Sequence, residues 1–265
     1  MYHKLYGLKQ SPFNVSADPQ FFFESSSHKE ALAALLYGIY ERKGIILVTG
    51  EVGTGKTTLC RTLLEKIPSE IKTSFILNPY FSDVQLLQAI VEDFGLKAPK
   101  NNRLEIIRTL NTFLVDINSY GSNAVLIVDE AQDLTARQLE QVRLLSNLET
   151  SQGKLLQIIL SGQPELLNKL NSFGLRQISQ RIFVRHNLIP LKKEEIGDYV
   201  EFRLKKAGAV RANILEDNYE IIYDFSKGIP RLINMLCDRA LLLGFVKNCK
   251  AFNQSIFESC IRELK

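Results

Sequence analysis

Residues 44–58 read Gly-Ile-Ile-Leu-Val-Thr-Gly-Glu-Val-Gly-Thr-Gly-Lys-Thr-Thr, and this stretch decides the fold. Its first half is a continuous β-branched and apolar run, which is typical of a strand buried in a parallel sheet. Its second half, residues 50–58, fits the pattern G-x-x-x-x-G-K-[ST] between a strand and a helix. Phosphates need close backbone N–H donors and the positive end of a helix, and glycines let the chain wrap that tightly. The stretch therefore predicts a phosphate-binding loop.

The polar residues of this loop have distinct expected roles. We expect Lys56 to neutralise the β and γ phosphates of a nucleotide, and the Thr57 hydroxyl to hold Mg²⁺. The full set of residues expected to bind the nucleotide within the loop is Gly50, Glu51, Val52, Gly53, Thr54, Gly55, Lys56, Thr57 and Thr58.

An acidic pair follows a second apolar run. Residues 124–130 read Ala-Val-Leu-Ile-Val-Asp-Glu. Ligands of parallel sheets bind at the carboxyl ends of the strands, where this pair lies. We expect Asp129 to reach the magnesium shell and Glu130 to polarise a water for attack on the γ phosphate. A hydrolytic carboxylate favours an ATPase over a small-molecule kinase.

Other polar residues flank later strands. Gln163 follows the apolar run 155–160 and is placed to sense a γ phosphate, although a polar loop before a helix started by Pro164 fits the spacing equally well. Arg176, Arg181 and Arg185 flank the last expected strand. They fit either a solvated helix end or a group that reaches a neighbouring subunit's nucleotide, and Arg181 is the first choice for the second role.

The carboxyl-terminal part contributes one further candidate. The sequence Gly228-Ile-Pro-Arg231 begins a strong helical pattern over 232–245. An arginine in the first turn opposes the helix dipole, which predicts a compensating anion such as a nucleotide phosphate. Tyr199 fits either a cover for the base or a core position, the latter being commoner for a tyrosine at helical spacing.

Strand and helix patterns alternate up to residue 190, and only helical periodicity remains after it. Ser27 and Glu30 have capping-box spacing and predict the start of the first long helix. We expect an α/β fold, with a parallel-sheet αβα nucleotide-binding domain over 1–190, including an N-terminal segment 1–26, and an all-helical lid of about four helices over 191–265. The expected strands are 44–50, 73–77, 124–128, 155–160 and 182–188, and the expected helices of the first domain include 82–95, 103–119 and 135–148.

Composition limits the function less sharply. The chain has 265 residues, 45% hydrophobic, and 33 basic against 29 acidic residues, so its net charge of +4 does not by itself indicate a polyanion partner. The four cysteines form no C-x-x-C pair, which disfavours a structural zinc site and suits a reducing compartment. No apolar run is long enough to span a bilayer, so we expect a cytoplasmic protein.

Taken together, these motifs resemble an AAA+ ATPase, specifically the ATPase domain of the general secretion pathway protein A (ExeA-like) family. The resemblance spans nearly the whole chain. It is carried by Tyr2-x-x-x-x-Gly-Leu8 with Pro12-Phe13, Asp18-Pro19, the loop 50–57, Val128-Asp-Glu-Ala-Gln132, Ser161-Gly-Gln-Pro-Glu-Leu166, Gln180-Arg-Ile182 and Gly228-Ile-Pro-Arg-Leu-Ile-Asn234. The resemblance implies Mg²⁺-dependent ATP hydrolysis by a homo-oligomer, with Gln163 as sensor one, Arg181 as arginine finger and Arg231 as sensor two.

Members of this family that act in type II secretion commonly continue into a transmembrane helix and a peptidoglycan-binding domain. The sequence ends after the helical part, so we expect a short form that a separate membrane protein recruits to the inner membrane. The main hypothesis is an ATPase that drives assembly or regulation of a cell-envelope export, secretion or pilus apparatus. The alternative is a DNA-associated regulator similar to the AAA+ ATPases that select transposition targets, against which the modest net charge argues. A nucleotide-gated scaffold with little turnover is a third reading, and Glu130 argues against it.

Overall fold

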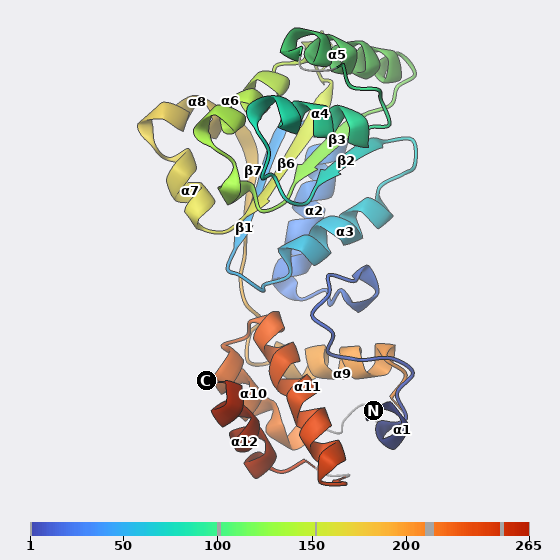
Figure 1. The fold of residues 1–265 in the computed structure, drawn as a ribbon, viewed down its shortest axis with the longest axis vertical. Helices are drawn as coiled ribbons and strands as arrows, with labels where there is room; N and C mark the ends of the chain where they lie inside the picture. Colours follow the sequence, from blue (N-terminus) through green and yellow to red (C-terminus); the bar gives the residue numbers. More distant parts are fainter. Residues whose placement is uncertain (1, 100–101, 152, 210–214, 250–251, 265) are drawn as a thin grey trace. The chain divides into compact units, whose positions relative to one another are not determined.

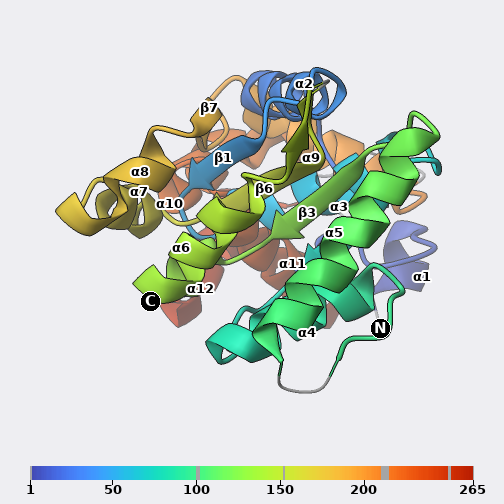
Figure 2. The ribbon, with the colours of Figure 1, turned by 90° about the horizontal axis from the view of Figure 1, so that it is seen from above.

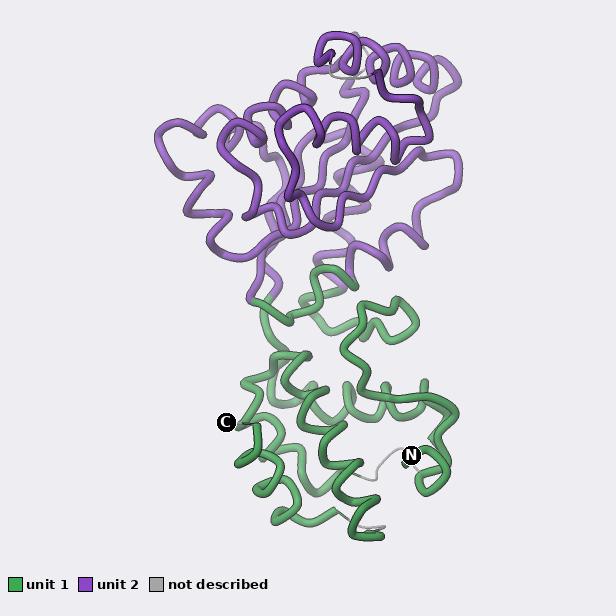
Figure 3. The backbone as a smooth tube through the Cα atoms, in the orientation of Figure 1, with its two compact units in different colours: residues 1–28, 52–58, 189–265 green, residues 29–51, 59–188 purple. Residues whose placement is uncertain are grey.

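A computed structural model describes residues 2–99, 102–151, 153–209, 215–249 and 252–264. The chain forms two compact units, which Figure 3 colours separately. We call residues 29–51 and 59–188 the sheet unit, and residues 1–28, 52–58 and 189–265 the helical unit. Each is described by itself below, and Figure 1 labels the elements.

The sheet unit is built on a five-stranded parallel sheet. The strands are β1 (Ile45–Gly50), β2 (Lys72–Ile76), β3 (Ala124–Val128), β6 (Leu156–Gly162) and β7 (Ile182–Leu188), in the spatial order β2-β3-β6-β1-β7. Every neighbouring pair is parallel. Val48 pairs with Ser161 and Val128 with Leu160, so the carboxyl ends of these three strands meet at one edge. This arrangement confirms the predicted α/β class.

Helices cover both faces of this sheet because its central strands β1, β3 and β6 are buried along their whole length. Alternate residues of β1 and β3, such as Ile45, Leu47 and Leu126, belong to one core with helices α4 (Asp83–Asp93), α5 (Arg103–Ser119) and α6 (Ala136–Leu145). On the opposite face, α2 (Ser26–Tyr40) approaches β1 so closely that Gly38 lies against Ile46. Figure 2 shows α2 on one side of the sheet and α4 to α6 on the other. Each fully buried Leu or Ile contributes about 1.5–3 kcal/mol to folding.

Shorter elements complete the sheet unit. They are η2 (Ala131–Asp133), the antiparallel pair β4 (Glu149–Thr150) and β5 (Gly153–Lys154), and then α7 (Glu165–Leu170), η3 (Phe173–Leu175) and α8 (Arg176–Ser179). Helix α3 (Lys56–Lys66) begins in the helical unit and continues into the sheet unit, as α2 does.

Side-chain caps explain where several helices begin. Ser82 and Gln85 form the capping box that starts α4, and Thr135 and Gln138 form one before α6. The prediction for the first long helix was wrong by two residues, because α2 begins at Ser26 and not after Ser27. The serine oxygen that accepts from its first turn is Ser25 Oγ, 3.3 Å from the N–H of His28. Ser27 Oγ accepts from the backbone N–H of Ile189 at 3.3 Å instead.

The helical unit joins the two ends of the chain. Within the described residues it contains α1 (His3–Tyr6), η1 (Pro19–Phe21), α9 (Glu195–Lys206), η4 (Glu216–Asn218), α10 (Tyr219–Ser226), α11 (Pro230–Val246) and α12 (Gln254–Leu264). Tyr2, Tyr6, Leu8, Phe13 and Phe21 are buried in one core with α9 to α12. The expected division placed segment 1–26 with the nucleotide-binding domain, whereas its buried aromatic side chains group residues 1–28 with the helical part.

A buried arginine fixes the N-terminal segment to α9. Arg203 Nε donates to the Pro12 carbonyl at 2.6 Å, and its Nη2 donates to the Asn14 carbonyl at 2.9 Å. Its guanidinium also lies 4.8 Å from the centre of the Phe21 ring. Tyr199 donates to Asn234 at 2.8 Å and accepts from Arg203, and burial raises the pKa of its hydroxyl. Tyr199 is therefore a core residue, the commoner of the two roles considered.

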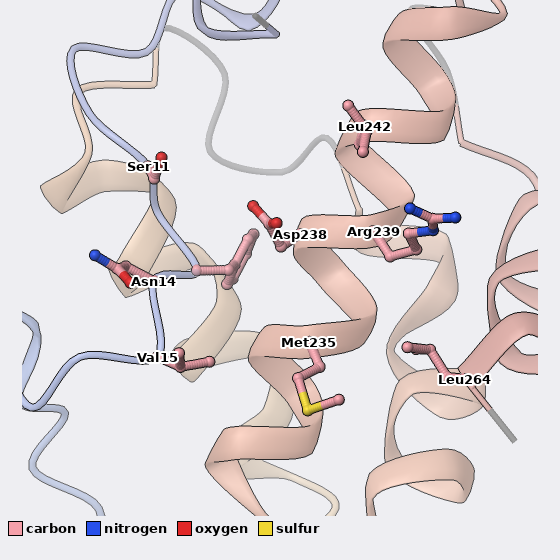
Figure 4. A pocket seen from close by; sticks show the side chains of 9 residues that line it. Ser11, Asn14, Val15, Met235, Asp238, Arg239, Leu242 and Leu264 are labelled. Carbon is pink, nitrogen blue, oxygen red and sulfur yellow. The ribbon is translucent and has the colours of Figure 1, made fainter.

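The same segment forms one wall of a groove of about 420 Å³ in the helical unit. Figure 4 shows it between residues 11–15, α11 and the end of α12. Tyr2 donates from its hydroxyl to Asp238, which lines the groove. The groove is thus built from the same contacts that attach the N-terminal segment to α11.

Among the residues that the structure describes, no helix has the length and apolar character needed to cross a membrane. Cys60, Cys237, Cys249 and Cys260, all among the described residues, form no disulfide, and burial raises the pKa of Cys237.

Gly228 tests the turn between α10 and α11. Its φ is +79°, and a Cβ there would lie 2.0 Å from the Leu191 carbonyl oxygen. We expect Gly228→Ala to lower the free energy of unfolding by more than about 3 kcal/mol, because backbone strain and a backbone clash add. Urea denaturation measures this. Gly121→Ala is the matched control, since Gly121 has φ +76° with nothing within 4 Å, and it should cost only about 1–2 kcal/mol. Equal losses in the two variants would contradict the clash.

Candidate functional site

The phosphate-binding loop has a backbone that requires glycine at two positions. It follows the last residue of β1 and leads into α3, with φ of +83° at Gly53 and +101° at Gly55. A Cβ at Gly53 would lie 2.6 Å from the Cβ of Arg231, and one at Gly55 would lie 3.0 Å from His28 Nε2. Side chains at either position would therefore fill the space that the loop closes around.

The side chains of the loop differ in exposure. Lys56 is only 6% exposed and Thr54 is fully buried, whereas Thr57 and Thr58 are half-buried. Glu51 and Val52 are exposed. A buried lysine in the first turn of α3 is disfavoured by the helix dipole, so an anion at this helix end would offset the cost. This arrangement fits a nucleotide phosphate.

Arg231 lies beside the loop. Its backbone N–H donates to the Gly53 carbonyl at 3.2 Å, at the beginning of α11 after Pro230. Its side chain is exposed. The structure therefore places Arg231 next to the loop, and the binding of a nucleotide phosphate by its guanidinium remains a prediction.

His28 also contacts the loop, which sequence reasoning did not anticipate. Its Nε2 lies 3.0 Å from the Thr54 carbonyl oxygen, and its Nδ1 lies 2.7 Å from Ser25 Oγ. A lone histidine in a helical pattern gives no local signal for such a contact, because the partner is a backbone atom 26 residues away.

The acidic pair begins with a buried aspartate. Asp129 is 1% exposed, and its backbone N–H donates to the Ile76 carbonyl at 2.9 Å. Ser161 Oγ donates to Asp129 Oδ1 at 2.6 Å, from the neighbouring strand end. The hydroxyl orients the carboxylate without cancelling its charge, which leaves Asp129 suited to an oxygen-ligated cation.

Glu130 is held by two side-chain amides. Its backbone has φ +49°, an uncommon conformation for a residue with a side chain. Its Oε2 accepts from Gln132 Nε2 at 2.7 Å and from Gln163 Nε2 at 3.3 Å. Gln132 Oε1 in turn accepts from the Gln163 N–H at 3.0 Å. The structure thus places Gln163 next to Glu130 and adds Gln132, which the sequence analysis left without a role.

A lysine fixes the turn that follows the acidic pair. Lys169 Nζ donates to the carbonyls of Gln132 at 2.5 Å and Leu134 at 2.9 Å. Gly162 leaves room for this turn, since a Cβ there would lie 3.0 Å from Gln132 Oε1. The conformation around Glu130 is therefore set by contacts from β6 and α7.

The three candidate arginines are all exposed, and each has a different local contact. Arg181 donates to the Asn147 side chain, while Arg185 donates to the backbone and hydroxyl oxygens of Ser179 at 2.7 and 2.9 Å. The Arg176 guanidinium lies 4.7 Å from the Phe173 ring centre. Arg181 is also attracted electrostatically to the carboxylates of Glu140 and Glu149.

The predicted residues thus form two groups, one in each unit. Loop residues 52–58 and Arg231 belong to the helical unit, as does His28, which was not predicted. Gly50, Glu51, Asp129, Glu130 and Gln163 belong to the sheet unit. Their chemistry fits Mg²⁺-ATP, because glycines frame the loop, a lysine is buried in it, and hydroxyl and carboxylate oxygens are ligands that Mg²⁺ accepts.

Comparison with known proteins agrees with this chemistry. Residues 39–170 match the AAA domain family. The chain is also 44% identical over 248 residues to general secretion pathway protein A of Aeromonas hydrophila, an alignment that covers 93% of this chain and 45% of that protein. The chain therefore spans about half the length of this relative.

Solved structures share the fold at low sequence identity. The ORC2 protein of Aeropyrum pernix has a TM-score of 0.67 at 15% identity, covering 90% of this chain and 67% of that one. Cdc6p of Pyrobaculum aerophilum has a TM-score of 0.68 at 18% identity, and the match covers 91% of this chain and 67% of that one. The Holliday junction branch migration motor RuvB of Thermotoga maritima has a TM-score of 0.61 at 16% identity, and the match covers 92% of this chain and 70% of that one. These likenesses show the P-loop NTPase fold of AAA+ proteins with a helical C-terminal region, as predicted.

Gly53→Ala tests whether loop closure matters for binding. We expect this variant to bind ATP at least about tenfold more weakly, because the new Cβ meets Arg231 and the backbone is strained. Isothermal titration calorimetry with Mg²⁺-ATP measures the affinity. Gly95→Ala is the control, since Gly95 has φ +81° with nothing within 4 Å. Wild-type affinity in Gly53→Ala would contradict the tight cradle.

Proposed function

We propose that this chain, which is related to general secretion pathway protein A, is an AAA+ ATPase that uses Mg²⁺-ATP hydrolysis to drive assembly or regulation of a cell-envelope export, secretion or pilus apparatus. The observation that carries the catalytic part is the glycine-framed loop with buried Lys56, on a chain that also holds an oriented acidic pair after β3. The envelope role rests on sequence identity over 93% of the chain.

Nucleotide binding follows from the loop. Its backbone N–H groups and the positive end of α3 bind the phosphates, and Lys56 neutralises the β and γ phosphates. Thr57 and Asp129 would hold Mg²⁺, which when bound draws charge from the phosphate oxygens. Ser161 keeps Asp129 in one orientation for this role. Arg231 would add a positive charge from the start of α11.

We assign Glu130 as the general base of ATP hydrolysis. Its carboxylate takes a proton from a water whose oxygen attacks the γ phosphorus, while the bond from that phosphorus to the β–γ bridging oxygen breaks. ADP and phosphate are the products. Gln163 is proposed as the group that senses the γ phosphate, and its amide contact with Glu130 supports this assignment.

A neighbouring subunit of the oligomer would supply a further positive charge at the nucleotide. We assign Arg181 as the arginine finger that reaches the nucleotide of a neighbouring subunit in a homo-oligomer. The exposure of its guanidinium supports the assignment. The protein would act in the cytoplasm, recruited to the inner membrane by a separate membrane protein. The DNA-associated alternative is not favoured, because identities of 15–16% to origin-recognition proteins solved with DNA show the fold alone.

Glu130→Gln tests the base. We expect ATP turnover to fall by at least about 100-fold, because a general base contributes that much or more, while ATP affinity stays near wild type. Steady-state phosphate release and ATP-binding titrations measure the two quantities. Lys56→Ala is the comparison variant and should lose binding itself. Wild-type turnover in Glu130→Gln would mean that another group is the base.

Arg181→Ala tests the proposed arginine finger, and duplex DNA added to the same assay tests the DNA-associated alternative. We expect specific activity to rise with protein concentration in the wild type, to ignore added duplex DNA, and to collapse in the variant at every concentration. Arg176→Ala and Arg185→Ala are matched controls that should retain activity. Concentration-dependent turnover with sedimentation velocity checks this. Turnover or assembly that appears only with DNA would contradict the envelope role.

A further inference from the structure

A loop that binds an anion through its backbone has a second requirement. Each peptide group that turns its N–H toward the anion turns an adjacent carbonyl away from it, and a buried carbonyl needs a donor. Two carbonyls of the loop have such donors within the helical unit. The Gly53 oxygen accepts from the Arg231 N–H at 3.2 Å, and the Thr54 oxygen lies 3.0 Å from His28 Nε2.

His28 is built into its place. Its side chain is 4% exposed, and its ring meets the Phe22 ring edge-on, with the centroids 5.4 Å apart. On the loop side, its Nε2 occupies the space that a Cβ on Gly55 would approach to 3.0 Å. The imidazole therefore lies directly against the two residues of the loop that precede Lys56.

The Thr54 carbonyl determines which nitrogen of a neutral His28 ring carries the proton, because a carbonyl oxygen can only accept a hydrogen bond. Ser25 Oγ accepts from the His28 backbone N–H at 3.3 Å and lies 2.7 Å from His28 Nδ1. A serine hydroxyl has one hydrogen, so an oxygen that already accepts from the backbone can donate that hydrogen to Nδ1. The neutral imidazole then has its own proton on Nε2, where it faces the Thr54 carbonyl.

We propose that His28 is a positioning residue for the phosphate-binding loop. Its Nε2–H holds the Thr54 carbonyl turned outward, so that the following N–H groups face the phosphates, and the Ser25 hydroxyl donates to Nδ1 of the same ring. The N-terminal segment thereby contributes to nucleotide affinity without touching the nucleotide. The proposal rests on the proposed nucleotide binding by this loop.

The test separates the hydrogen bond from simple packing. His28→Leu keeps apolar volume and removes the donor, whereas His28→Gln places an amide N–H near the position of Nε2. Ser25→Ala keeps the imidazole and removes only the hydroxyl that donates to Nδ1. The full-length chain is used throughout, and circular dichroism verifies that each variant is folded.

Two readouts are needed. The first is the affinity for ADP with Mg²⁺, by calorimetry; we expect His28→Leu to bind about tenfold more weakly, Ser25→Ala about threefold, and His28→Gln within about threefold of wild type. The second is amide hydrogen exchange of the peptide spanning 50–58 without nucleotide. We expect faster exchange in His28→Leu than in His28→Gln.

The outcomes are distinguishable. Wild-type affinity and wild-type exchange in His28→Leu would overturn the proposal, and equal losses in the Leu and Gln variants would assign His28 to packing instead. If His28→Leu does not fold, unchanged affinity in Ser25→Ala together with a loss in His28→Gln would overturn it. If the wild type itself binds no ADP, the proposed function fails, while hydrogen exchange without nucleotide still tests the contact with Thr54.

Discussion

Backbone hydrogen bonding at the phosphate-binding loop is the constraint on which much of this structure depends. The loop can present N–H groups to an anion only if its carbonyls are bound elsewhere. Arg231 at the start of α11 binds one, and His28 at the start of α2 lies against the next. Gly53 and Gly55 are required because these two neighbours leave no room for a side chain. The loop is therefore shaped from outside as much as by its own sequence.

The acidic pair is organised by a complementary rule. Neutral donors contact both carboxylates: a hydroxyl from Ser161 to Asp129, and amides from Gln132 and Gln163 to Glu130. Such donors fix orientation without themselves neutralising the negative charge, as a lysine or arginine would. Lys169 donates to the backbone carbonyls of Gln132 and Leu134, in the turn that follows the acidic pair. Its charge thus stabilises the turn instead of these acids.

Local signals explain which parts could be predicted from sequence. Strands 124–128 and 182–188 and helix 103–119 have the expected bounds, because buried runs and helical spacing are properties of short segments. The loop and the acidic pair were found for the same reason. The partners that position them were not, since His28 contacts Thr54 and Gln163 contacts Glu130 across long separations. Nor did the sequence indicate that Arg203 would bind the carbonyls of Pro12 and Asn14, which places residues 1–28 in the helical unit.

That placement has a consequence for how the chain folds. The core of the helical unit combines Tyr2, Tyr6 and Phe13 with residues of α11 and α12 that are synthesised more than two hundred positions later. Contacts of such high sequence separation form slowly, because a long loop must close before they are made. During synthesis these early aromatic side chains emerge from the ribosome well before their partners exist. The sheet unit can complete its core first. The side chains of Tyr2, Tyr6 and Phe13 stay exposed to chaperones until α11 and α12 have been synthesised.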